Sequence, residues 1–317
     1  MVTLAIGIIY GISIQRYKVF PYKQIKNAYQ YLSHWVDKSY GPWSIGIYIH
    51  STPFDLADSE DILNPVLTGK DVDDIDAEYV ADPFMIIKDG RYYMFFEVMN
   101  RETNQADIGY AESEDGLKWK YKKIVIDEKY HLSYPCVFEW QGNYYLIPES
   151  HENLSVQIYM ASSFPEEWKF IGNILNGHRY TDPTIFRYNN KWWLFVSNIF
   201  SDVLNLYYSE ELLTGWKPHP MNPIIKLDKN ISRPGGKVIV YDDHIYRLTQ
   251  DDDPSYGIQV FAFEITELSE NSYKEKIFSE EPVVKKTGKG WNADGMHHVD
   301  LHKVGDGWIA VVDGRNE

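Results

Sequence analysis

The sequence of 317 residues is poor in cysteine, in positive charge and in long apolar runs, and each shortage excludes a class of protein. Its one cysteine, Cys136, permits neither a disulfide framework nor a cysteine-built zinc site. The formal net charge of −15 argues against nucleic acid as the partner, because phosphate backbones are bound by clustered Lys and Arg. The sequence also contains no phosphate-binding loop, zinc-ligand spacing or serine triad.

The uncharged run at residues 2–14 is too short for a transmembrane helix, which needs about 20 residues. No small-residue cleavage site follows it, so a cleaved signal peptide fits poorly. Two interpretations stay open: a membrane anchor, either interfacial or the end of a longer segment, and an element packed on the domain. Residues 22–39 have apolar side chains at helical spacing and predict an amphipathic helix. Residues 1–40 are therefore expected to form a separate N-terminal segment.

Residues 41–317 contain an internal repeat of strand, polar turn and strand, which is the signature of a β-hairpin. The first positions of the five repeats are Asp82, Tyr134, Asp182, Gly235 and His298. The corresponding last positions are Glu97, Glu149, Ser197, Gln250 and Asp313. A third strand follows most hairpins, and three of these strands end in a tryptophan: Trp119, Trp168 and Trp216. Aromatic residues, with 25 Tyr, 14 Phe and 10 Trp, are typical of strand-rich folds and of carbohydrate sites.

The repeats predict an all-β fold, a five-bladed β-propeller closed by an N-terminal strand. The fifth repeat reaches Glu317 before a third strand, whereas residues 45–56 match the third-strand pattern. Pairing these two ends of the chain closes the ring and removes exposed sheet edges. The alternative is a β-sandwich with chance similarity, but five segments in one register favour the propeller.

Four carboxylates are candidates for catalysis because they occupy repeat positions that open towards the central funnel. Asp82 and Asp182 each precede a proline at the first position, where β-propensity disfavours Asp. Glu97 follows an aromatic run, and desolvation there raises a carboxyl pKa as a general acid requires. Glu149 follows Pro148, which interrupts strand pairing. The alternative for the aspartates is a turn cap, and for the glutamates a blade-edge carboxylate.

Imidazole and guanidinium groups gather in the loops that lead into the first strands and are expected to converge on one face. The candidate substrate-binding residues are Tyr134, His131, His178, Arg179, Arg233, Gln250, His297 and His298. Such a mouth favours a substrate with a carboxylate, phosphate or sulfate, or else pairing with the site's own Asp and Glu. His298 also faces the axis and is a candidate ligand for a structural calcium in the central channel. No other cofactor is expected.

The motifs ADPF, SYP and DPTIF, with third strands that end in Trp, resemble the five-bladed propeller enzymes of glycoside hydrolase family 43 and its clan. Across residues 41–317, the longer motifs HLSYPCVFEW, YYLIPES, SRPGG and GMHHVD resemble the N-terminal propeller module of plant glucosamine inositolphosphorylceramide transferases and its bacterial relatives. In family 43 a base, a pKa-tuning aspartate and a general acid act together. Asp82 matches the base and Asp182 the third-blade aspartate, while Gly235 stands where the family has its acid.

Two functional hypotheses follow from this resemblance. In the first, the chain is a glycosidase-like enzyme in which Asp82 activates water or attacks, Asp182 tunes, and Glu149 or Glu97 donates the proton. In the second, it is a non-catalytic module that binds a glycan or glycolipid beside a partner glycosyltransferase. Facing carboxylates favour the enzyme, whereas Glu97 and Glu149 both turned away from Asp82 favour the module.

Overall fold

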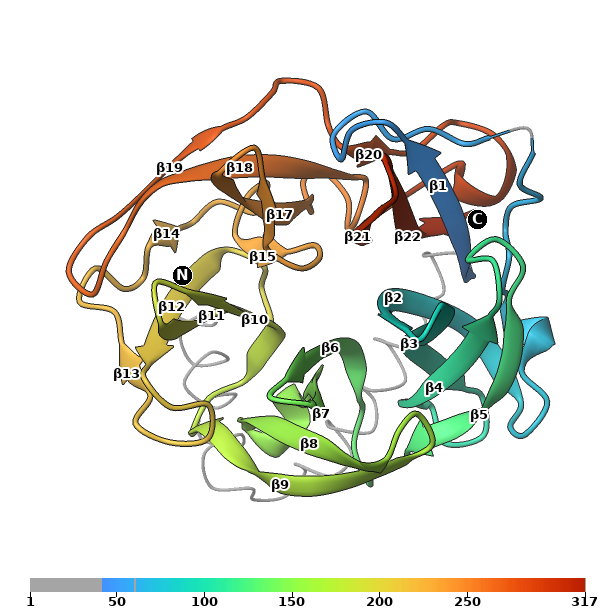
Figure 1. Ribbon diagram of the computed structural model, residues 1–317, viewed down its shortest axis with the longest axis horizontal. Helices are drawn as coiled ribbons and strands as arrows, with labels where there is room; N and C mark the ends of the chain where they lie inside the picture. Colours follow the sequence, from blue (N-terminus) through green and yellow to red (C-terminus); the bar gives the residue numbers. More distant parts are fainter. Residues whose placement is uncertain (1–41, 60, 317) are drawn as a thin grey trace, which may run out of the picture. The chain divides into compact units, whose positions relative to one another are not determined.

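The computed structural model describes residues 42–59 and 61–316, which form five antiparallel sheets around a central axis (Figure 1). The predicted five-bladed β-propeller is therefore confirmed. Within these residues there is no α-helix, and the only helical turns are three short 3-10 helices: η1 (Gly69–Asp71), η2 (His151–Asn153) and η3 (Gly290–Asn292).

Each blade lies on one contiguous stretch of chain, except the fifth. Blade 1 contains β2 (Ala77–Lys88), β3 (Arg91–Asn100), β4 (Gln105–Ser113) and β5 (Lys120–Ile126). Blade 2 contains β6 (Ser133–Trp140), β7 (Asn143–Glu149), β8 (Ser155–Ser163) and β9 (Glu167–Asn176). Blade 3 contains β10 (Tyr180–Tyr188), β11 (Lys191–Asn198), β12 (Val203–Ser209), β13 (Lys217–Pro218) and β14 (Ile225–Lys226). Blade 4 contains β15 (Arg233–Pro234), β16 (Ile239–Tyr241), β17 (His244–Asp251), β18 (Gln259–Leu268), β19 (Tyr273–Ile277) and β20 (Val284–Lys285).

Blade 5 joins the two ends of the described chain, as the incomplete fifth repeat predicts. It consists of β21 (Val299–Val304), β22 (Gly307–Arg315) and the N-terminal β1 (Trp43–His50). β1 pairs antiparallel with β22 from Trp43 opposite Arg315 to His50 opposite Trp308. Ile45 and Ile47 of β1 are fully buried, so the closing strand also contributes to the core. Closure leaves β22 without an unpaired edge.

The aromatic residues mostly pack the blades against one another. Phe95, for example, has a fully buried ring that contacts Trp168 of the next blade edge to face, with centroids 5.3 Å apart. The three tryptophans after the third strands make equivalent hydrogen bonds, in which the indole N–H closes the preceding turn. Trp119 donates to the Gly116 carbonyl, Trp168 to the Pro165 carbonyl and Trp216 to the Leu212 carbonyl, over 3.0, 2.8 and 2.9 Å. The high aromatic content thus reflects the fold more than sugar binding.

The first positions of three repeats form a backbone bulge that turns their side chains out of the strand pattern. Asp82, Tyr134 and Asp182 have φ angles of 52°, 45° and 47°, in the left-handed region. The register of the first and second strands shifts at each of them, and each precedes a proline, which has no N–H to donate. Left-handed backbone costs a residue other than glycine about 1–3 kcal/mol and is concentrated at functional sites.

The expected N-terminal helix over residues 22–39 and the apolar run at residues 2–14 lie outside the described residues. Among the described residues, no helix has the length and apolar character needed to cross a membrane.

Candidate functional site

The strand ends and bulges of neighbouring blades are joined by carboxylates. Glu149, at the end of β7 in blade 2, accepts a hydrogen bond from the bulged backbone N–H of Asp182 in blade 3 over 3.0 Å. Asp313, at the end of β22 in blade 5, accepts the equivalent bond from the N–H of Asp82 in blade 1 over 3.1 Å. Both acceptors are buried, with 3% and 0% of their surface exposed. We call this interaction the inter-blade latch.

Glu97 occupies the equivalent position in blade 1 but does not make the latch. The bulged N–H of Tyr134 instead donates to Asp82 Oδ2 over 3.2 Å. Glu97 Oε1 accepts from the Tyr79 hydroxyl over 3.2 Å and lies 3.6 Å from His131 Nε2. Burial raises the pKa of Glu97 well above its usual range, and the neighbouring Asp82 carboxylate raises it further. Glu97 therefore has the raised pKa that a proton donor needs. Burial likewise raises the pKa of Asp182, although the neighbouring Arg233 opposes this shift.

Glu149 has the opposite properties. Besides the latch, its Oε1 lies 2.6 Å from His151 Nδ1 and its Oε2 lies 3.6 Å from the Arg233 guanidinium. Burial alone would raise its pKa, but His151 and Arg233 together hold the pKa of Glu149 well below its usual range. Glu149 is thus a charged acceptor that carries no proton to donate near neutral pH.

Arg233 of β15 is bound by the site's own acids. Its Nε donates to Asp182 Oδ2 over 2.5 Å, and a terminal nitrogen donates to Asp182 Oδ1 over 3.4 Å. Its guanidinium also lies over the Tyr256 ring, 5.2 Å from the centroid. Gln250 also donates to Asp182 Oδ2, over 2.7 Å. Of the two roles that the sequence left open for Arg233, pairing with internal carboxylates is the one observed.

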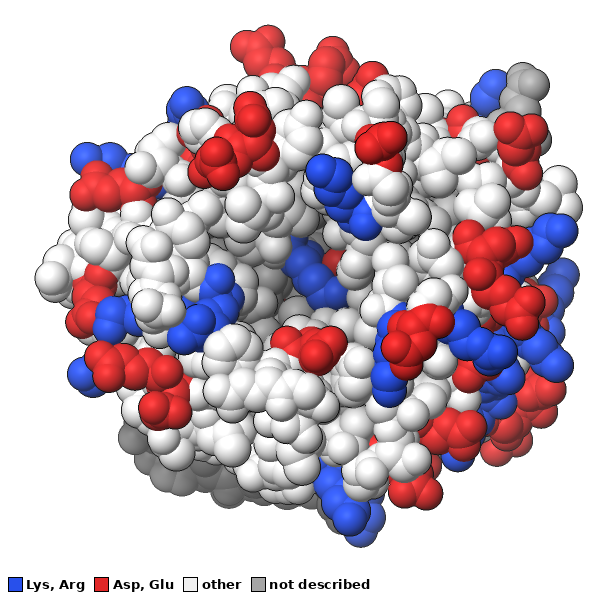
Figure 2. Space-filling model, in the orientation of Figure 1, with Lys and Arg blue, Asp and Glu red and all other residues white. Residues whose placement is uncertain are grey.

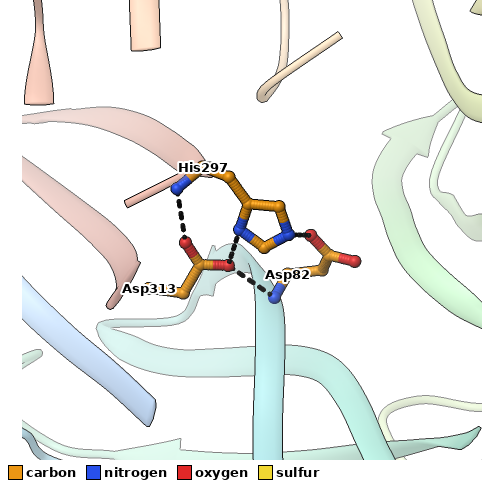
Figure 3. A group of neighbouring side chains, drawn as sticks. All are labelled: Asp82, His297 and Asp313. Carbon is orange, nitrogen blue, oxygen red and sulfur yellow. Dashed lines mark hydrogen bonds and ion pairs between the residues drawn. The ribbon is translucent and has the colours of Figure 1, made fainter. Parts of the chain in front are cut away.

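Asp82, His297 and Asp313 form a chain of ionisable groups between blades 1 and 5 (Figure 3). His297 Nδ1 lies 2.8 Å from Asp313 Oδ2, and its Nε2 lies 3.5 Å from Asp82 Oδ1. Burial opposes the charged imidazole, but Asp313 and Asp82 together raise the pKa of His297. One imidazole therefore bridges the latch carboxylate and the candidate base.

These three residues could also hold a metal ion, because one potential ligand atom from each lies within 4.8 Å of the other two. Within the described part of the chain, this is the one group of at least three His, Cys, Asp or Glu residues that meets this condition. His298, the sequence's candidate for calcium, is fully buried beside them, with Nδ1 3.9 Å from Asp82 Oδ1. Neither ring nitrogen of His298, nor Asp82 Oδ1, makes a hydrogen bond within the described residues. These atoms fit a cation as donors, although calcium takes six to eight ligands, mainly oxygen.

Tyr134 of blade 2 contacts residues of three other blades. It is fully buried, its hydroxyl lies 2.8 Å from Thr184 Oγ1, and the N–H of Gly236 donates to it over 2.8 Å. Gly236 permits this approach, because a Cβ there would lie 1.9 Å from the Val299 carbonyl oxygen. The Tyr134 ring packs edge to face on Phe84. Tyr134 thus contacts protein on all sides and offers no face for a sugar to stack on.

The remaining predicted residues lie at the rim of the site. His178 and Arg179 are exposed in the loop between β9 and β10, whereas His131 is only partly exposed and contacts Glu97. In Figure 2 the ring is hollowed at its centre, where Lys or Arg atoms are visible next to Asp or Glu atoms. Within the candidate site, Arg233 is paired with Asp182 and Glu149, so the site is not a uniformly positive mouth.

Sequence reasoning missed three residues of this site as ligands or partners. His151 binds Glu149 from the η2 turn, and Tyr256 contacts both Arg233 and His297 from the loop before β18. Asp313 was recognised only as a repeat end. A signal existed for Asp313, since it shares its repeat position with Glu97 and Glu149. His151 and Tyr256 lie in loops that vary between the repeats, so the repeat pattern gives no register for them.

The family model described as glucosamine inositolphosphorylceramide transferase 1, N-terminal, matches residues 36–315. The transferase of that name from Oryza sativa subsp. japonica is 33% identical over 300 residues, which cover 86% of this chain and 40% of the rice protein. Its namesake from Arabidopsis thaliana is 34% identical over 298 residues, covering 86% of this chain and 39% of that protein. The chain thus spans well under half the length of these relatives.

Solved structures with similar folds include glycoside hydrolases. A family 117 glycoside hydrolase from Zobellia galactanivorans aligns with a TM-score of 0.55 at 16% identity, covering 86% of this chain and 90% of that one. An α-L-arabinofuranosidase from Podospora anserina aligns with a TM-score of 0.57 at 11% identity, covering 88% and 98%. At such identities the likeness establishes the propeller fold alone.

Proposed function

Because this chain belongs to the family of the N-terminal domain of glucosamine inositolphosphorylceramide transferase 1, we propose that it is a non-catalytic glycan-recognition module. It binds the sugar headgroup of a glycolipid in the hollow of the propeller and works beside a glycosyltransferase activity. The glycolipid follows from the name of the relatives, which joins an amino sugar and an inositol phosphate to a ceramide lipid.

The observation that carries this proposal is the engagement of Glu149. In the glycosidase hypothesis Glu149 is the first choice for the acid, which must hold a proton and release it to the leaving oxygen. Here three neighbours, namely the Asp182 N–H, His151 and Arg233, all favour its charged form. The place where family 43 has its acid holds Gly235. Glu149 therefore holds blades 2 and 3 together as a charged acceptor. This role is compatible with a binding module, whereas a general acid must carry a proton.

The charge balance of the site indicates the kind of sugar it binds. Five carboxylates gather there: Asp82, Glu97, Glu149, Asp182 and Asp313. Arg233, His297 and His151, the nearby cationic groups, are each already paired with a member of this set. A phosphate or carboxylate would find these cations already engaged by internal carboxylates, whereas hydroxyl and ammonium groups find carboxyl oxygens as acceptors. We therefore favour a neutral or aminated sugar over the strongly anionic one that the loop composition predicted.

Hydrolysis remains the second candidate, and one observation favours it. Glu97 adjoins Asp82, so the two carboxyl groups are not turned away from each other, and the pKa of Glu97 is raised as an acid requires. In this version Glu97 donates the proton and Asp82 activates water or attacks. The calcium expected near His298 likewise remains a proposal.

Isothermal titration calorimetry with a panel of neutral, aminated and phosphorylated oligosaccharides tests the proposal. Binding of a neutral or aminated sugar, weakened in Asp82→Asn and unchanged in the exposed control Asp306→Asn, supports it. No binding to any sugar, or binding unaffected by Asp82→Asn, contradicts it. Thin-layer chromatography of the same mixtures separates the two candidates, because only the enzyme yields smaller sugars.

A further inference from the structure

Exposed apolar side chains project from the loops on the site's edge of blades 2 and 3. Leu227, Phe200, Leu154 and Ile199 expose 86%, 65%, 47% and 39% of their surface. Phe200 and Ile199 follow Asn198, which pairs with Tyr180 at the start of β10, so their loop borders the site's edge of the sheet. Leu227 lies in the chain adjoining that loop, since the Asp228 N–H donates to the Asp202 carbonyl over 3.3 Å. Leu154 is held in the neighbouring blade 2 loop by the N–H of Gly177.

Cations without an ion pair accompany these apolar tips. Arg179 is exposed two residues after Gly177, whose N–H holds Leu154, and Lys226 and Lys229 are exposed on either side of Leu227. Within the described residues, no ion pair joins any of these three cations to an acid. Of the acids in these segments, Asp202 and Asp228 are partly buried and bound to Asn198 and to the Asn230 N–H, and the exposed Glu152 accepts from the His131 N–H. In a chain with 46 acidic and 31 basic residues, most cations have acids available to pair with, so three cations without an ion pair in one region are unusual. The four apolar tips and these three cations together are called the apolar rim.

We propose that the apolar rim docks on the surface of a lipid bilayer. The proposal rests on the proposed function, because a glycolipid headgroup is presented at a membrane and the rim borders the binding hollow. Exposed apolar tips insert at the boundary between headgroups and acyl chains, and adjacent Lys and Arg bind lipid phosphates. Docking by this rim turns the mouth of the hollow towards the lipid that bears the sugar.

The opposite edge of the propeller offers a matched control. Leu213 lies in the loop between β12 and β13, at the end of the blade where Ser209 pairs with Trp192 rather than at the end bordering the site. It exposes 45% of its surface, similar to Leu154. The native thiol adds little background in labelling, because Cys136 is buried and burial raises its pKa to about 11.

The test attaches the environment-sensitive dye NBD to Phe200→Cys, Leu227→Cys and Leu213→Cys in the full chain. Vesicles of phosphatidylcholine and phosphatidylinositol are then added. We expect a several-fold rise in emission with a blue shift at positions 200 and 227, and no change at 213. Because each dye reports its own surroundings, membrane contact elsewhere in the chain does not mimic this result. Unchanged emission at 200 and 227, or an equal response at 213, overturns the proposal.

A second variant keeps the test independent of labelling. Phe200→Ser combined with Leu227→Ser should weaken vesicle binding about tenfold while leaving the binding of a soluble oligosaccharide unchanged. If the soluble sugar binds but the rim does not respond to vesicles, docking is wrong and the proposed function stands. If the rim responds but no sugar binds, the proposed function is wrong and docking stands.

Discussion

Glu149 Oε2 accepts the backbone N–H of Asp182 over 3.0 Å, and this bond joins blade 2 to blade 3 at the bulge that positions Asp182. Asp313 does the same for Asp82 across the closure of the ring. Carboxylates at one repeat position therefore hold the blades together, and the equivalent Glu97 is left for another role.

Replacing Glu149 should therefore lower the free energy of unfolding. Glu149→Ala leaves the buried Asp182 N–H without its acceptor and His151 without its partner, and removal of one partner from such a buried network costs about 3–5 kcal/mol. Glu149→Gln keeps an acceptor and should cost less. Urea unfolding measures both, with the exposed Glu139→Ala on the same blade as the control. Equal stability of Glu149→Ala and Glu139→Ala would contradict the latch.

The His151–Glu149 pair should make stability depend on pH. Burial opposes its charge, but Glu149 raises the pKa of His151 above its unfolded value of about 6.5. A raised pKa in the folded state contributes stability that is complete below pH 6.5 or so and disappears as pH rises through the folded pKa. The difference in unfolding free energy between wild type and His151→Gln should therefore shrink as pH rises. Urea titrations across the pH series measure it, and a difference that grows with pH would refute the pairing.

Closure of the ring by β1 predicts a contrast between two isoleucines of one strand. Ile45 is fully buried, whereas Ile49 exposes 37% of its surface. Ile45→Ala should lower the free energy of unfolding by about 2–5 kcal/mol, as for other buried apolar truncations, and Ile49→Ala by much less. Thermal and urea unfolding give both values. If the two substitutions cost the same, β1 does not pack into the core as described.

Glu97 provides the sharpest functional contrast with Glu149. If Glu97 and Asp82 receive the sugar, Glu97→Gln should weaken sugar binding about tenfold or more through the altered acceptor, while the fold keeps its stability because Glu97 makes no latch. Calorimetry gives the affinity and urea unfolding the stability. A variant that loses stability but not affinity would place Glu97 among the structural carboxylates.

The repeat made most of the fold predictable from the sequence. Five hairpin segments in one register set the number of blades, and the lack of a third strand after the fifth hairpin predicted that the N-terminal strand completes the last blade, as β1 does beside β22. The register also marked Asp82, Tyr134 and Asp182 as equivalent, which their shared left-handed backbone confirms. Each repeat position is defined within one short segment of the chain, so the sequence alone can identify residues that occupy the same position in different blades.

The partners within the site could not be predicted in the same way. Whether Arg233 faces a ligand or Asp182 depends on the distance between blades, which no repeat spacing encodes. The opposite pKa directions of Glu97 and Glu149, two glutamates at one repeat position, arise from His151 and Arg233 on other segments. Residue type and repeat position singled out these carboxylates as candidates, and only the packed structure distinguishes their surroundings.

The central claim is that this propeller binds a glycan without cleaving it. The most direct measurement incubates the chain with the sugar that it binds best, at several pH values, and follows the sugar by mass spectrometry. The account predicts that the sugar stays intact at every pH, for wild type and Glu97→Gln alike. Release of a smaller sugar by wild type that stops in Glu97→Gln and in Asp82→Asn would contradict it and establish a hydrolase.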